Sequence, residues 1–291
     1  MALPDHTKGV LITGLGVLVL TPDSLLVRLI EADYWTIMFW RGLLTGIFML
    51  LGLALAYRRK FPAYVIVIGR PGIVFTIIFG LGNACFVVSL FMTSVANVLF
   101  IYAASPLISA ALSPFYLKEN VSRPTGIAIF CALFGVGIIV SGSVERGGHS
   151  VWGDLLALGA SISVAITFLI ARKHRDRSMV PAMGLSGIVT AIIALPFMTS
   201  FTVGGDTEIY VMLIGLVGAV AFGLMIIGPR YLPAPEVGLL LLLEAVIGPY
   251  WVFLVLGEDP GPRALIGGCV VIFTLIVLNS YMLMRNRGKK L

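Results

Sequence analysis

The stretch SPLISAALSPFYLKE, residues 105–119, has a counterpart near the C-terminus in EAVIGPYWVFLVLGE, residues 244–258. Both stretches are apolar over most of their length, and both end in a glutamate. Glu119 corresponds to Glu258 at an offset of 139 residues. This recurrence predicts an internal repeat, in which two copies of one helical unit face each other.

The chain around this repeat is apolar almost throughout, since 59% of its 291 residues are hydrophobic and 12% are charged. A water-soluble domain of this size would carry a larger charged surface. About 20 apolar residues in a helix cross a hydrocarbon core of about 30 Å. We therefore predict an all-α integral membrane protein with ten transmembrane helices. The predicted spans are 9–30, 35–57, 72–93, 95–116, 124–144, 152–170, 179–200, 210–227, 234–256 and 262–283.

The ends of the first and sixth spans also repeat. Gly9 and Arg28 bracket the first span, and Gly153 and Arg172 bracket the sixth at the same spacing. Residues 1–146 and 147–291 then hold five spans each, and an odd number of spans makes the second copy enter the membrane from the opposite side. We expect one membrane domain built from two inverted five-helix repeats, a design that permits alternating access.

The basic residues predict the orientation. Most of the 20 Lys and Arg residues fall on the side that holds both termini, whereas Arg28, Arg146 and Arg263 fall on the other side and Arg41 lies within a span. Basic loops stay cytoplasmic, so we predict cytoplasmic termini and a location in the bacterial inner membrane. The net charge of +6 is explained by this topology and by attraction to membrane lipid. No nucleic-acid partner is expected, and the oligomeric state stays open, with a monomer as the simplest case.

The sequence lacks the motifs of several functional classes. Cys85, Cys131 and Cys269 lie inside predicted spans without metal-ligand spacing, so no metal or other cofactor is expected. The sequence contains neither a GxxxxGK[ST] phosphate loop nor an HExxH motif. An ATP-driven pump or an enzyme is therefore not predicted.

Three charged residues fall well inside predicted spans, away from the span ends, although each costs about 2.5 to 3.5 kcal/mol at the bilayer centre on insertion scales. Asp23 and Arg41 flank a tight hairpin, each about 10 Å below the outer surface, so we expect them to pair. The pair either fixes the hairpin permanently or separates when a charged substrate competes for one member. Glu244 lies about 15 Å deep, near the midplane, where it could bind a substrate amine, carry a coupling proton, or stay neutral and hydrogen-bonded.

Pro106 predicts a helix break near the membrane centre, because it cannot donate to the carbonyl of Tyr102. Such a break is tolerated only where it meets protein or a water-filled cavity. Tyr102, Ser105, Pro106 and Asn83 could form the polar wall of a binding site. The other interpretations are a kink that helps packing and, for Asn83, an interhelical hydrogen bond.

Aromatic residues supply candidate apolar surface. Trp40, Phe86 and Tyr250 could contact an apolar substrate side chain, although aromatics near helix ends also serve as interfacial anchors. Gly42 and Gly46 form a GxxxG motif, which predicts a close helix contact.

These residues, taken with their order, resemble the drug/metabolite transporter superfamily and within it the EamA-type carriers, including their amino-acid exporter group. The similar segments are Arg28, FWRG around Arg41, residues 93–119 and residues 232–258. The resemblance implies a ten-helix carrier with inverted repeats that exports amino acids and related metabolites. One departure is Ala245, which follows Glu244 where the family usually has proline. Pro249 comes later instead, and places any break in that helix a turn nearer the exterior.

We therefore expect a secondary transporter that moves a small-molecule substrate by alternating access, with neutral or aromatic amino acids as the exported class. The alternative is a proton-coupled exporter of lipophilic cations, in which Glu244 alternates between a proton and the cation.

Overall fold

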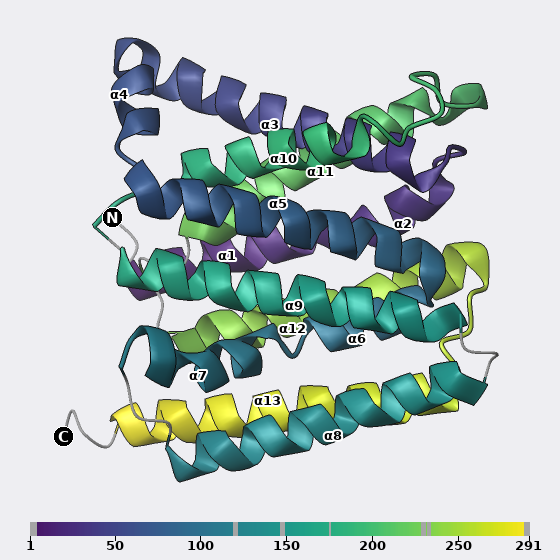
Figure 1. Cartoon of the computed structure of the whole chain (residues 1–291). Helices are drawn as coiled ribbons and strands as arrows, with labels where there is room; N and C mark the ends of the chain where they lie inside the picture. The colour runs from purple at the N-terminus through teal and green to yellow at the C-terminus, as the bar shows by residue number, and fades with distance from the viewer. Residues whose placement is uncertain are drawn as a thin grey trace.

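The computed structural model describes residues 5–118, 122–145, 149–174, 176–227, 231 and 234–287. Within these residues all regular structure is helical, and the long helices lie side by side in one bundle (Figure 1). α1 begins, and α13 ends, at the same end of this bundle (Figure 1).

The first part of the chain forms five apolar segments, two of which are interrupted. The elements are α1 (Asp5–Leu20), α2 (Asp23–Leu29), α3 (Tyr34–Tyr57), η1 (Arg58–Lys60), α4 (Phe61–Ile66), α5 (Gly69–Met92), α6 (Val95–Tyr102), α7 (Ser105–Tyr116) and α8 (Arg123–Glu145). Pro22 separates α1 from α2, and Pro106 follows the separation of α6 from α7. The break predicted at Pro106 is therefore present.

The second part forms five further apolar helices. They are α9 (His149–Lys173), α10 (Val180–Ala194), α11 (Glu208–Ile227), α12 (Ala234–Leu256) and α13 (Pro262–Arg287), with the short η2 (Gly205–Thr207) before α11. α12 runs through Pro249 as one helix, so no break occurs there. The expectation of a break near Pro249 was wrong, because proline inside a long packed helix is tolerated when neighbouring helices support the backbone.

Seven segments of the described chain are long and apolar enough to cross a membrane, and three shorter helices are also apolar. The seven are Thr7–Leu29, Tyr34–Ile66, Gly69–Met92, Val95–Tyr116, Arg123–Gly142, Ser150–Lys173 and Glu208–Ile227, and the shorter ones are Val180–Ala194, Leu240–Leu256 and Pro262–Leu278. Each coincides with a predicted span. The lengths confirm a multi-pass membrane protein, while ten crossings in two repeats stay a prediction.

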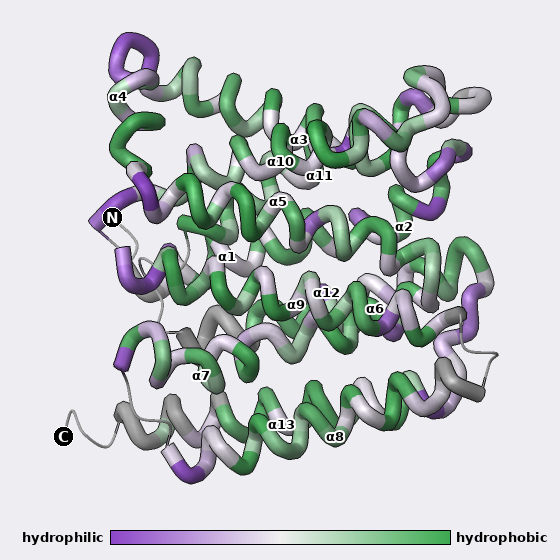
Figure 2. Tube along the Cα trace, viewed as in Figure 1, coloured by the Kyte–Doolittle hydropathy of each residue, from purple (hydrophilic) through white to green (hydrophobic). Residues whose placement is uncertain are grey.

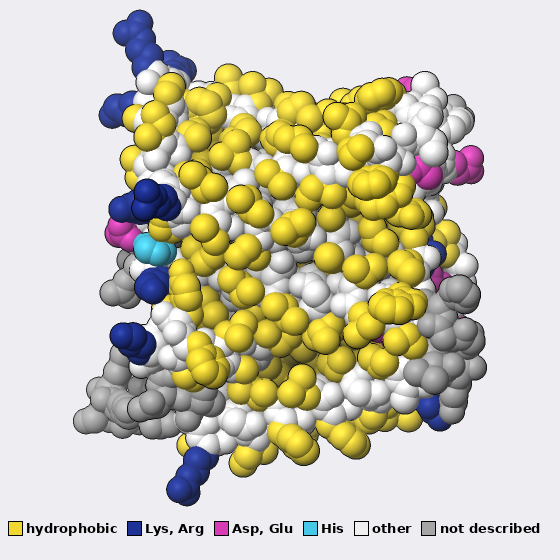
Figure 3. Space-filling model, in the orientation of Figure 1, with side chains coloured by type: hydrophobic (Ala, Val, Ile, Leu, Met, Phe, Trp, Pro, Cys, Tyr) yellow, Lys and Arg dark blue, Asp and Glu magenta, His cyan; other side chains and the backbone are white. Residues whose placement is uncertain are grey.

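Polarity follows the ends of the bundle. Figure 2 shows hydrophobic residues along the helices and hydrophilic ones mainly where helices begin and end. In Figure 3, Lys and Arg gather at the end where α1 begins, and Asp and Glu are prominent at the opposite end. We call these the basic end and the outer end, the second name following the predicted orientation.

Close helix contacts involve glycine. A methyl group built on Gly42 would lie 2.6 Å from the carbonyl oxygen of Gly187, and one on Gly46 would lie 2.8 Å from that of Gly184. Those distances are shorter than any real contact of a Cβ atom, so α3 and α10 touch through their backbones. The GxxxG prediction is confirmed. A second backbone contact joins α8 and α13, where a methyl group on Gly267 would lie 2.5 Å from the Gly135 oxygen.

The helix pairs in contact form a regular pattern. α3 packs against α10, and α8 packs against α13. The remaining main contacts between the two parts form three matched pairs. The contact of α5 with α9 corresponds to that of α11 with α1, and the contact of α5 with α10 corresponds to that of α11 with α3. The contact of α7 with α9 corresponds to that of α12 with α1. If each of the first five segments is exchanged, in order, for the corresponding one of the second five, the same pattern of contacts results.

Asp33 fixes the start of α3. Its carboxylate accepts hydrogen bonds from the backbone N–H groups of Trp35 and Thr36 and from the hydroxyls of Thr36 and Thr199. Burial raises the pKa of Asp33, but these four hydrogen bonds outweigh it and bring the pKa below its usual 3.8. The cap holds α3, which carries Arg41, in place after the tight turn.

Candidate functional site

The predicted pair of Asp23 and Arg41 is present. Asp23 opens α2 and Arg41 lies in the second turn of α3, with only a short turn between the two helices. Nη2 of Arg41 donates to Oδ2 of Asp23 at 2.8 Å, and Nε donates to Oδ1 at 3.2 Å. Both side chains are 3% exposed. This two-point contact orients both groups and offsets much of the cost of burying them.

Arg41 has further partners. Its Nη1 donates to Oδ1 of Asn83, and its guanidinium carbon lies 5.8 Å from the centre of the Phe86 ring. Nδ2 of Asn83 in turn donates to Oγ1 of Thr190 at 3.4 Å. The sequence offered Asn83 as a ligand or as an interhelical hydrogen bond, and the structure gives it hydrogen bonds to α3 and α10. Thr190 was not anticipated.

Glu244 lies in α12 and is 8% exposed. Among the residues that the structure describes, it takes part in no hydrogen bond and no ion pair. A buried carboxyl group without a partner is costly, which makes this residue a candidate for a group that meets a ligand or a proton.

Two adjoining cavities collect most of the predicted residues. The first, of about 20 Å³, is lined by Asp23, Arg41, Asn83, Phe86, Tyr102 and Glu244 together with apolar neighbours. The second, of about 40 Å³, is lined by Tyr102, Ser105, Pro106 and Glu244 among others. Tyr102 and Glu244 belong to both. Ligand pockets usually measure about 300–1,000 Å³, so the walls must separate before a metabolite can enter.

Trp40 and Tyr250 lie away from these cavities. Nε1 of Trp40 donates to the carbonyl oxygen of Phe201 at 3.0 Å, in the connection after α10. Tyr250 is 58% exposed on the surface of α12. The aromatic wall comes instead from Phe86 and from Phe79 and Phe222, whose rings meet edge to face at 5.7 Å.

The break between α6 and α7 has a partner on α9. Oγ of Ser161 lies 3.2 Å from the carbonyl oxygen of Ile101 and 3.4 Å from that of Tyr102. The sequence indicated a freed carbonyl at Tyr102 but not the hydroxyl that reaches it. Ser161 is fully buried, so its hydroxyl stabilises backbone groups that no water would reach.

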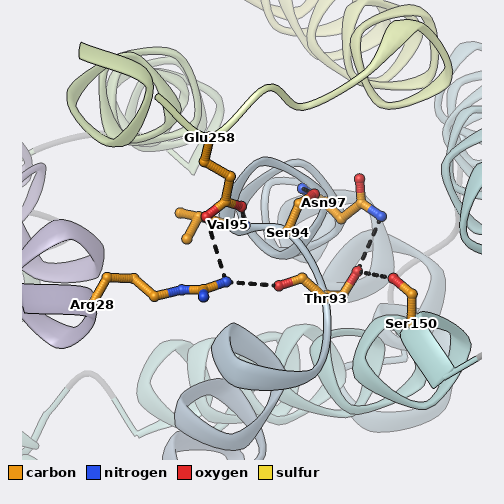
Figure 4. A network of polar contacts seen from close by, with 7 residues as sticks. All are labelled: Arg28, Thr93, Ser94, Val95, Asn97, Ser150 and Glu258. Atoms are coloured by element: carbon orange, nitrogen blue, oxygen red, sulfur yellow. Dashed lines mark hydrogen bonds and ion pairs between the residues drawn. The ribbon is translucent and has the colours of Figure 1, made fainter. Parts of the chain in front are cut away.

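A polar network joins the helices at the outer end (Figure 4). Oε1 of Glu258 accepts from the backbone N–H of Val95 at 2.8 Å, and Oε2 lies 3.5 Å from Nη2 of Arg28. The same Arg28 nitrogen donates to the carbonyl oxygen of Thr93 at 3.0 Å. Glu258 thus binds both the start of α6 and a basic residue. Its counterpart Glu119, like the boundary at 146–147, lies outside the described residues.

The network continues to a carboxyl group that the sequence analysis missed. Oγ1 of Thr93 donates to Oδ1 of Asp154 at 2.8 Å and lies 2.7 Å from Oγ of Ser150. Nδ2 of Asn97 also donates to Asp154, at 3.1 Å. Asp154 is the third residue of the predicted sixth span, and it is buried although it lies close to the end of that span. Its place so near the helix end concealed this role.

Comparisons with known proteins agree with this arrangement. The model of the EamA-like transporter family matches residues 9–141 and again residues 151–280. The chain belongs to the EamA-like transporter family. It is therefore a member of a family of membrane transporters, and the resemblance to the drug/metabolite transporter superfamily is confirmed.

Comparison with individual proteins informs only on the fold and on the class of protein. The "Uncharacterized transporter YyaM" of Bacillus subtilis (strain 168) is 28% identical over 192 residues, which cover 63% of this chain and 61% of that relative. The crystal structure of another protein is similar to this one with a TM-score of 0.64 and 17% identity, over 97% of this chain and 99% of the other. This second likeness shows that the fold is shared.

Proposed function

We propose that the protein is a secondary transporter that exports small metabolites by alternating access, with neutral or aromatic amino acids as its substrates. The observation that carries this proposal is Glu244, a buried carboxyl group without a partner among the described residues, in the wall of both cavities. Arg41 lines the first of these cavities, so groups of both signs are available to a zwitterion. Phe79, Phe86 and Phe222 supply apolar surface for its side chain.

Three features support two inverted repeats. The family model matches the chain twice. The helix contacts keep their pattern when the two sets of five segments are exchanged. In Figure 1, α1 begins at the end of the bundle where α9 stops. Repeats of opposite orientation can exchange conformations, which opens a central site first to one side and then to the other.

The second candidate is a proton-coupled exporter of lipophilic cations. The observation that favours it is the two-point contact of Arg41 with Asp23, which a substrate carboxylate would have to displace. Glu244 needs no such exchange and could hold a proton or a cation in turn. On either candidate we place the protein in the bacterial inner membrane with both termini in the cytoplasm, because α1 begins and α13 ends at the basic end (Figures 1 and 3).

Counterflow in proteoliposomes tests both candidates. Purified full-length protein would be offered a mixed panel of amino acids and cationic dyes, each measured against empty liposomes. Preferential exchange of neutral or aromatic amino acids supports the first candidate, and exchange confined to dyes supports the second. Vesicles indistinguishable from empty ones across the panel would refute both.

One substitution links the activity to the cavity. Glu244→Gln removes the charge with little change of shape. On the second candidate we expect it to abolish transport of every substrate, whereas on the first candidate an amino-acid uniporter would keep part of its activity. Glu31→Gln is the matched control, because Glu31 is exposed in the turn between α2 and α3. Equal exchange by both variants would show that Glu244 has no part in transport.

A further inference from the structure

The charges that line the two cavities do not cancel. The walls contain two carboxyl groups and one guanidinium group. The carboxyl groups belong to Asp23 and Glu244, and the guanidinium group belongs to Arg41. Asp23 and Arg41 offset each other through contacts of 2.8 and 3.2 Å. The carboxyl group of Glu244 is not offset by a basic group in this way. Because charges interact strongly in a medium of low dielectric constant, the wall suits a ligand that brings a positive group.

The second cavity gathers side chains with unused hydrogen-bonding capacity. Ser105 is 3% exposed and Glu244 is 8% exposed, and Tyr102 lines the same cavity. In the described part of the chain, neither hydroxyl and neither oxygen of the carboxyl group takes part in a hydrogen bond. Buried polar groups nearly always have partners in folded proteins. Ser105 and Glu244 are buried and Tyr102 is half-buried, so these three groups around one cavity indicate that a ligand supplies the missing bonds.

These groups favour an amine over a carboxylate. An ammonium group at Glu244 would form charge-assisted hydrogen bonds. A carboxylate would find the neutral hydroxyls of Tyr102 and Ser105 and the partial positive charge at the start of α7, which begins at Ser105. It could gain Arg41 only by displacing Asp23, which already holds the guanidinium at two points.

The rest of the second cavity is apolar. Its wall is made by aromatic rings, sulfur-containing chains and aliphatic groups, among them Phe79, Phe168, Phe222, Met183, Met225 and Leu241. Methionine side chains adapt to different shapes, and aromatic rings provide large flat contacts. Such a wall accommodates an aromatic or branched aliphatic group without fixing its shape.

From these observations we infer that the carrier selects its substrate by a primary amine and an apolar side chain, and that a free carboxylate is dispensable. The ligand class then includes neutral amino acids and their amides, esters and decarboxylated amines. This inference rests on the proposed function, because it concerns the same site. It assigns Arg41 and Asp23 to the support of the wall and Glu244 to substrate contact.

Competition in counterflow tests this inference. Liposomes with the full-length protein would exchange radiolabelled L-phenylalanine in the presence of unlabelled L-phenylalanine, L-phenylalanine amide or N-acetyl-L-phenylalanine. We expect the amide to inhibit within about threefold of phenylalanine, because the lost carboxylate met no charged side chain. The N-acetyl compound should be weaker by about 10- to 150-fold, the range for a lost hydrogen bond to a charged group. An amide at least tenfold weaker, or an N-acetyl compound as strong as phenylalanine, would overturn the inference.

Two variants assign the preference to residues. Glu244→Gln should bring phenylalanine and its N-acetyl derivative to equal potency, and Ser105→Ala should weaken phenylalanine and its amide by the same factor. Glu31→Gln and Ser109→Ala are the matched controls, since Glu31 is exposed and Ser109 lies one turn along α7 outside both cavities. A Glu244→Gln protein that keeps the full preference for the free amine would overturn the inference.

The outcomes separate the two proposals. Liposomes that exchange no amine at all would refute the proposed function and the inference with it. Liposomes that exchange phenylalanine but reject its amide would refute the inference alone. If Glu244→Gln fails to fold, the order of the three competitors on the unaltered protein decides the matter.

Discussion

Glu258 offers a quantitative test of how the outer end opens. Its carboxylate caps the backbone N–H of Val95 at 2.8 Å and lies 3.5 Å from Arg28. Both contacts join the connection between α12 and α13 in the second proposed repeat to the first repeat, so they must break if the repeats part at this end. Glu258→Ala removes both, and Glu258→Gln removes the charge while keeping an acceptor for the helix end (Figure 4).

The structure sets the size of the effect. Loss of a side-chain cap at a helix N-terminus costs about 0.5–2 kcal/mol. The ion pair is 25% and 24% exposed, and pairs near a surface contribute about 0.2–1 kcal/mol. If both contacts exist only while the outer end is closed, Glu258→Ala raises the open population by about 3- to 150-fold, at about 1.4 kcal/mol for each factor of ten. Glu258→Gln should fall between this variant and the unaltered protein.

Cysteine labelling measures that population. Ala96 is buried beside the network in α6, so a cysteine placed there reacts with a membrane-impermeant maleimide only when the outer end opens. The native cysteines would first be replaced. We expect the labelling rate to rise in the order unaltered protein, Glu258→Gln, Glu258→Ala. Equal rates in all three, or the same rise in the control Glu31→Gln, would refute the argument that Glu258 holds the outer end closed.

Three further substitutions test the packing and the caps. Gly187→Ala should destabilise the protein by about 1–3 kcal/mol in detergent unfolding, because its methyl group meets a carbonyl oxygen at 2.6 Å. Gly52→Ala, with nothing within 4 Å, should not. Ser161→Ala should cost about 1–3 kcal/mol in the same assay, since it leaves a buried carbonyl without a donor, and an unchanged midpoint would contradict that role. Asp33→Asn should destabilise the protein at neutral pH and progressively less below about pH 4. The lowered pKa stabilises the fold above the usual 3.8 and this contribution is lost in acid, so a difference that grows in acid would contradict the cap.

The sequence could predict features that depend on position along a helix. The depth of Asp23 and Arg41 follows from the short turn between their helices, so their pairing was predictable. The break before Pro106 follows from the missing proline N–H. These inferences needed only helix geometry, which is the same whether a helix meets lipid or protein.

Features that depend on which face of a helix points inward could not be predicted from the sequence. A helix apolar all round gives no periodic pattern, so Tyr250 could be assigned to the cavity although it lies exposed on α12. The same ambiguity hid Ser161 and Thr190, because small hydroxyl residues occur on every face. Asp154 was passed over for another reason: nearness to a helix end suggests exposure, but the neighbouring helices bury it.

The glycine contacts between α3 and α10 and between α8 and α13 have a mechanical consequence. Gly42 and Gly187 occupy comparable places in the proposed repeats, and at each of the two crossings backbone lies directly against backbone. A rotation of one repeat against the other about a line through both crossings would keep these backbone contacts in place. Displacement would grow with distance from that line, as in a lever. A small angle at the crossings would then become a large separation at the two ends of the bundle.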